Sequence, residues 1–90
     1  MLFEWDSSKN AANISKHGID FRDAIDMFNH PMLTGIDERF AYGEERWRAI
    51  GLMRQLVGVV VYTERREDVV RIISARKATR REVRLYEQNI

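Results

Sequence analysis

The feature that most constrains the fold is a nearly continuous apolar run from Leu56 to Thr63, four of whose residues are valine. The seven residues as far as Tyr62 form the longest such run in the chain, whereas a membrane-spanning helix needs about 20. A short run that is apolar at both odd and even positions, and rich in β-branched residues, is typical of a strand buried on both faces. The run therefore predicts the central strand of a sheet.

Four further segments are predicted to form strands around it. A charged turn at 64–68 separates the run from the next apolar segment, and Arg54-Gln55 forms a tight connection to the preceding one. The short aromatic segment near the start of the chain suits an edge strand, and a turn region is expected over 37–43. The predicted strands are 2–5, 32–36, 46–53, 56–63 and 69–75.

Capping residues bound three predicted helices. Asp6 is a helix N-cap and Gly18 a helix stop, so together they frame the first helix. Asp20 caps a second helix, which ends at His30-Pro31, and the segment Thr79–Glu82 is a capping box that opens a third. The first helix is expected over 7–17, and the third ends near residue 87.

These elements follow the order β-α-α-β-β-β-β-α. Strands that follow one another through short turns favour antiparallel pairing, with the helices packed on the sheet. We therefore predict an α+β fold with a mostly antiparallel sheet, and one domain over residues 1–90, a length that can fold alone.

The net charge of +1 hides an asymmetry between the two parts of the chain. Residues 1–40 carry four Lys or Arg against seven Asp or Glu, a balance of −3, whereas residues 41–90 carry eleven against seven, a balance of +4. Eight of the basic residues lie between Arg65 and Arg84. This density of cations, mostly arginine, indicates a surface that binds phosphate groups or another polyanion.

Several classes of site are excluded by the composition. The chain has no cysteine, so disulfides, thiol catalysis and zinc–thiolate sites are excluded. Its two histidines lie in unrelated settings, so neither a metal site nor a cofactor is expected. The beginning of the chain has no secretory pattern, and no apolar run is long enough to span a membrane, so the protein is expected in the cytoplasm.

A set of short motifs, in a fixed order across the chain, resembles the BrnT family of bacterial toxins over essentially the whole length. Each motif is weak by itself, whereas the ordered set at matching spacings is specific. The matching residues are Phe3-Glu4-Trp5-Asp6, Lys9, Asn13, Lys16-His17-Gly18, Phe21, Ala24, Phe28, Glu45-Arg46, Val59–Thr63, Arg71–Arg76, Ala78, Glu82 and Tyr86.

The resemblance implies a RelE-like fold and a ribonuclease toxin of a type II toxin–antitoxin module. It also implies metal-independent cleavage of free RNA, which inhibits translation. The expected partner is a BrnA-like antitoxin with a ribbon-helix-helix domain, in a 2:2 heterotetramer. DNA would be contacted only through that antitoxin.

The first predicted helix carries a polar stripe of Lys9, Asn13, Lys16 and His17, which helical spacing places on one side. With the resemblance, His17 is a candidate acid–base residue, because imidazole ordinarily titrates near neutral pH. Lys9 and Lys16 are then candidate RNA-binding residues. The alternative is that Lys16 and His17 only complement the helix dipole.

Two more candidate groups come from the sheet and the last helix. Glu44, Glu45 and Arg46 lie where a turn becomes a strand. One of the two glutamates, with Glu45 taken as the candidate, could act as a base, and Arg46 could orient it or bind phosphate; an exposed charge cluster without a role remains the alternative. Arg76 lies at a strand end beside a helix N-terminus, which favours phosphate binding. Arg80 and Arg84 form a basic ridge for RNA, or else a solvated helix face.

The predicted catalytic set is therefore His17, Glu45, Arg46 and Arg76. The alternatives to a ribonuclease are a non-catalytic RNA- or protein-binding module of the same fold, and an α+β domain whose arginines only keep it in solution. No local motif separates these alternatives, and the resemblance favours the ribonuclease.

Overall fold

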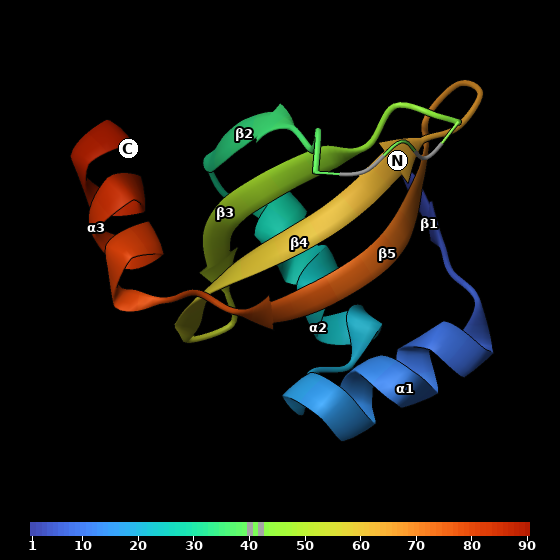
Figure 1. Ribbon diagram of the computed structural model, residues 1–90, viewed down its shortest axis with the longest axis horizontal. Helices are drawn as coiled ribbons and strands as arrows, with labels where there is room; N and C mark the ends of the chain where they lie inside the picture. The colour runs from blue at the N-terminus through green and yellow to red at the C-terminus, as the bar shows by residue number, and fades with distance from the viewer. Residues whose placement is uncertain (40, 42) are drawn as a thin grey trace.

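A computed structural model of the chain describes residues 1–39, 41 and 43–90. It contains one five-stranded sheet in the order β1-β5-β4-β3-β2 (Figure 1). The strand built from the long apolar run is central, as predicted. The strands are β1 (Leu2–Glu4), β2 (Met32–Ile36), β3 (Trp47–Met53), β4 (Leu56–Glu64) and β5 (Val69–Lys77).

The helices begin where the capping residues predict. The Asp6 side chain accepts hydrogen bonds from the backbone N–H groups of residues 8 and 9, and Gly18 ends that helix in a left-handed conformation. Asp20 caps the second helix, and Thr79 and Glu82 form the predicted capping box. The helices are α1 (Ser7–His17), α2 (Phe21–Ala24), η1 (Ile25–Asn29) and α3 (Arg80–Asn89).

The second predicted helix differs in one respect. It is α-helical for only four residues and then continues as the 3₁₀ helix η1, which places Met27 in the core before the chain reaches Pro31. The expected turn over 37–43 includes residues 40 and 42, which lie outside the described residues. No helix among the described residues is long and apolar enough to cross a membrane.

Pairing within the sheet is antiparallel except at one edge, where β1 runs parallel to β5. The other irregularity is a bulge between β4 and β5. Val61 pairs with Ser74 and Tyr62 pairs with Ile72, so Ile73 is an extra residue on β5. A mostly antiparallel α+β sheet, as predicted, is confirmed.

The two faces of the sheet are covered unequally. One face packs against Phe21, Ala24 and Met27, all fully buried, and contains the main hydrophobic core. The opposite face is covered only in part by α3, whose Val83 and Tyr86 pack against a second, smaller cluster. The part of this face that α3 leaves uncovered adjoins the C-terminal end of α1 and contains a hollow.

Candidate functional site

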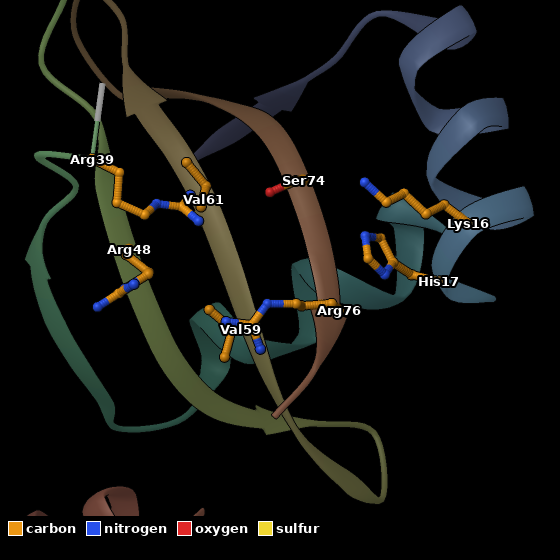
Figure 2. Close-up of a pocket in the computed structure, with 8 residues that line it drawn as sticks. All are labelled: Lys16, His17, Arg39, Arg48, Val59, Val61, Ser74 and Arg76. Carbon is orange, nitrogen blue, oxygen red and sulfur yellow. The ribbon is translucent and has the colours of Figure 1, made fainter. Parts of the chain in front are cut away.

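A hollow of about 290 Å³ lies on the uncovered face of the sheet. Val59 and Val61 lie centrally in it, with basic side chains around them (Figure 2). Lys16 and His17 reach it from α1 on one side (Figure 2). On the other side Arg39 points toward the two valines, and Arg48 lines the edge of the hollow with its guanidinium turned away from them. The lining residues are Lys16, His17, Arg39, Arg48, Val59, Val61, Ser74 and Arg76.

Strand alternation and register place the strand residues in this hollow. Side chains two positions apart on a strand point to the same face. Val61 pairs with Arg48 on one side and with Ser74 on the other, and Val59 pairs with Arg76. Three neighbouring strands thus contribute their side chains to one surface.

Asn13 fixes α1 at the edge of this surface. Its side-chain amide is buried and donates to the carbonyl oxygens of Ile19 at 2.9 Å and Ala75 at 2.8 Å. Its side-chain oxygen accepts from the backbone N–H of Ala75 at 3.2 Å. Since Ala75 precedes Arg76, this contact sets the position of Lys16 and His17 relative to the arginine.

Arg76 is held by the first turn of α3. Its guanidinium donates to the two carboxylate oxygens of Glu82 at 2.7 and 2.8 Å, and to the Lys77 carbonyl at 3.2 Å. Glu82 also accepts from the backbone N–H of Thr79 at 2.9 Å as part of the capping box. The bonds from Arg76, reinforced by that N–H and opposed by burial, lower the pKa of Glu82 to about 2. The same pairing raises the pKa of Arg76, against burial and the nearby charge of Arg39.

The other two arginines differ in how they are held. Asp37, whose side chain is only 1% exposed, accepts from Arg39 at 2.8 and 3.0 Å. Arg48 forms no ion pair with any other described residue. No carboxylate is among the lining residues, so the hollow presents cations to whatever enters it. Within the described chain, no three His, Asp or Glu side chains are grouped to hold a metal ion.

The structure brings together three of the predicted site residues, Lys16, His17 and Arg76. Lys9 lines a shallower hollow that shares Lys16, His17 and Ser74 with the first, and is therefore adjacent to it. These positions agree with a shared role, and the individual roles stay predictions.

The other four predicted residues do not line this hollow. Arg46 pairs with Glu44 at 3.3 Å, and the Glu45 carbonyl accepts from the Thr63 hydroxyl at 2.9 Å beside the end of β4. Arg80 and Arg84 lie on α3, which is apart from α1 (Figure 1). The catalytic and RNA-binding roles of these four residues also stay predictions.

Sequence reasoning missed three polar lining residues, Arg39, Arg48 and Ser74. A signal existed for Arg48, because its neighbour Ala49 belongs to the apolar face of β3 and alternation then places Arg48 on the other face. No local signal identifies Arg39, which lies in the region after β2 and depends on Asp37 for its position.

Replacement of Glu82 with glutamine should change stability in a pH-dependent way. The pKa of Glu82 falls from 4.5 to about 2 on folding. Its stabilising contribution is therefore fully present above pH 4.5 and is lost as the pH falls through about 2. We expect the variant to lose about 1–3 kcal/mol of unfolding free energy at neutral pH and to show a flatter dependence below pH 4.5. Denaturant unfolding at several pH values measures this, with Glu87→Gln on the same helix as control; equal pH dependence in both variants would contradict the expectation.

The fold and the hollow together define a class of protein: a small α+β domain with a preorganised group of arginines suited to phosphate groups of a nucleic acid. Residues 5–82 match the model of a family described as the ribonuclease toxin BrnT of type II toxin–antitoxin systems. The chain therefore belongs to the BrnT family of ribonuclease toxins.

A solved structure agrees with this assignment. The crystal structure of the Brucella abortus ribonuclease toxin BrnT, at 1.1 Å, superposes with a TM-score of 0.67 and 26% sequence identity. The alignment covers 89% of this chain and 100% of the Brucella chain. A search of curated proteins gave no match. The BrnT family and the mostly antiparallel α+β fold are thus confirmed.

Proposed function

We propose that this toxin is a metal-independent endoribonuclease that cleaves free RNA in the basic hollow and thereby inhibits translation. The observation that carries the proposal is the convergence of Lys16, His17 and Arg76 with two further arginines on one open face. Fixed cations aimed at a phosphate supply the electrostatic stabilisation that a metal ion supplies in other nucleases. A surface with this charge also repels metal cations.

The chemistry requires two proton transfers and stabilisation of charge on phosphorus. The 2′-oxygen of a ribose attacks the adjacent phosphorus while its proton passes to a base. The bond from phosphorus to the 5′-oxygen of the next nucleotide breaks, and that oxygen takes a proton. The products carry a 2′,3′-cyclic phosphate and a 5′-hydroxyl group.

The residues of the hollow divide these tasks. His17 is proposed to transfer a proton, and Arg76 to bind the phosphate oxygens while Glu82 holds its guanidinium in place. Lys16 and Lys9 extend a cationic path along α1 for neighbouring phosphates, and Arg80 continues it at the start of α3. Glu45 and Arg46 are proposed as a second acid–base pair, which requires RNA to reach the end of β4 where they lie.

The partner of a type II toxin is an antitoxin. We propose a BrnA-like protein with a ribbon-helix-helix domain, in an assembly of two toxins on one antitoxin dimer. In such an assembly the antitoxin contacts DNA and the toxin does not. The measured mass of the complex purified from co-expressed chains tests the 2:2 stoichiometry.

The catalytic proposal predicts that purified, antitoxin-free toxin cleaves RNA in the presence of EDTA. Replacement of His17 with alanine should lower the rate about 10²–10⁴-fold, the usual contribution of a positioned acid–base group. His30→Ala is the matched control, since His30 lies beside Asp26 and outside the hollow, and it should cleave at the wild-type rate. An RNA with a 2′-deoxy residue at the cleavage position should resist cleavage.

Three outcomes would contradict parts of this proposal. No cleavage by the wild type, with or without Mg²⁺, would refute ribonuclease activity and favour a non-catalytic binding module. Cleavage only with Mg²⁺ would refute metal independence. Equal rates for wild type and His17→Ala would remove His17 from the mechanism.

A further inference from the structure

A second surface, distinct from the centre of the basic hollow, lies along the outer edge of β2. Among the described strands, none pairs with this edge, so its outward backbone groups are available to another chain. At Gly35 an added Cβ would meet no atom within 4 Å, so the face of β2 is open at that residue. An edge of this kind is a template for strand addition.

The surface next to this edge is apolar. A groove between β2 and α3 is lined by Leu33, Ile36, Ile50 and Leu85, with Arg48 at its rim. Ile36 is 49% exposed and Leu85 46% exposed. Leu85 also lines a hollow on α3, so the two depressions adjoin at this residue.

The rim of this surface is basic and not neutralised by the chain itself. Arg81 and Arg84 line the hollow on α3 and, within the described residues, form no ion pair. Of the two carboxylates on α3, Glu82 is bound to Arg76, and Glu87 lines neither depression. A partner that covers the apolar residues must therefore bring acidic groups.

The opposite edge of the sheet, at β1, lacks this combination of an apolar groove and unpaired arginines. β1 has only three residues, and Glu4 beside it pairs with Arg71 at 2.9 Å and Arg65 at 3.9 Å. The N-terminal amino group pairs with Asp68 at 2.7 Å. Because these charges already have partners, the β1 edge has less electrostatic attraction for an acidic segment.

We propose that an extended, acidic segment of the antitoxin, carrying aliphatic side chains, binds as an added strand along β2 and fills the groove against α3. Its carboxylates pair with Arg48, Arg81 and Arg84. The inference rests on the proposed function in one respect, that the partner is the antitoxin.

Arg48 lines both the groove and the basic hollow, so binding of the antitoxin in the groove can inhibit the toxin. Arg48 is the one arginine of the hollow that is not paired with a carboxylate of the described residues. A carboxylate that binds it from the groove would neutralise its charge. The antitoxin then lowers the affinity for RNA without filling the hollow. For Arg84 this assignment replaces the RNA contact predicted from sequence.

RNA is the alternative occupant, and the exposed side chains disfavour it. Single strands are bound by aromatic side chains on which bases stack. Ile36 and Leu85 are aliphatic, and the groove between them has no aromatic lining among the described residues. Aliphatic residues within a basic rim suit a protein segment instead.

The test uses the full chain and the protein encoded by the adjoining reading frame as the probe. Ile36→Lys, Leu85→Lys and Arg81→Glu should each weaken binding of that protein about 10–100-fold by calorimetry. Leu2→Lys, on the β1 edge and 68% exposed, is the matched control and should bind as the wild type does. All four variants, freed of the probe, should cleave RNA at the wild-type rate.

Hydrogen exchange of the wild-type complex gives a second measurement that does not depend on any variant. Amide groups of residues 32–36 should be protected by the probe, and those of residues 2–4 should not. Wild-type affinity in the three groove variants, protection at β1 in place of β2, or no binding by the wild type would overturn the proposal. A loss of RNA cleavage in the groove variants with unchanged probe binding would assign the surface to RNA and overturn it as well. If neither the wild type nor any variant cleaves RNA, but the three groove variants bind the probe more weakly as predicted, only the ribonuclease proposal is refuted.

Discussion

Replacement of Arg76 with alanine is expected to lower the rate of RNA cleavage about 10²–10³-fold, the usual cost of removing one preorganised donor to a developing oxyanion. A second effect adds to this loss. The Glu82 carboxylate, now bound to the guanidinium at 2.7 and 2.8 Å, would be left as an unpaired negative charge close to the path of the phosphate. Single-turnover cleavage of a defined RNA measures the change.

Two controls separate the causes. Arg66→Ala removes an arginine that lines a different hollow, next to β1, and should leave the rate unchanged. The double variant Arg76→Ala with Glu82→Gln should recover several-fold of the lost rate if repulsion contributes. A rate for Arg76→Ala within about twofold of the wild type would exclude Arg76 from phosphate binding in the transition state.

Replacement of Asn13 with alanine is expected to have the largest effect on stability. The change leaves the Ile19 and Ala75 carbonyls and the Ala75 N–H without their side-chain partner in a buried region. Each buried, unsatisfied polar group costs about 1–3 kcal/mol, so we expect a loss of about 2–4 kcal/mol in the free energy of unfolding. Denaturant titration measures this loss.

The same variant should also cleave RNA more slowly, because α1 would lose its fixed position against β5 and with it the placement of Lys16 and His17. Asn89→Ala is the control, since the Asn89 amide bonds the Leu85 carbonyl on an exposed helix end. The stability of this variant should change by less than about 0.5 kcal/mol. A loss below about 1 kcal/mol in Asn13→Ala would show that water replaces the missing amide.

Most elements of the fold could be predicted because their signals are local. Asp6, Gly18 and the capping box at Thr79 fix helix ends through the residues next to them, and the valine-rich run fixes the central strand. The parallel pairing of β1 with β5 has no such signal, because it joins residues more than 60 positions apart and depends on where α1 and α2 pack. The change from α2 to the 3₁₀ helix depends in the same way on how Met27 reaches the core.

The site could be predicted only in part, for a similar reason. Arg76 and His17 belong to recognisable local patterns, a strand end and a helix end. Arg39 is brought to the hollow by the buried Asp37, and nothing next to either residue in sequence indicates this burial. Glu45 and Arg46 show the opposite case, a conspicuous charge cluster that does not line the hollow.

The bulge on β5 has a consequence for how this protein can be altered. Before Ile73, Val70 and Ile72 face the core; after it, Ala75 does, so the inward side chains change from even to odd positions. Deletion of Ile73 would restore strict alternation with Ala75 still toward the core and Arg76 still toward the hollow. A regular strand that kept Ile73 would instead turn Arg76 toward the core. The strand thus has two segments separated by one inserted residue. The first can be altered as part of the scaffold, whereas a change in the second also shifts the site residues that it carries.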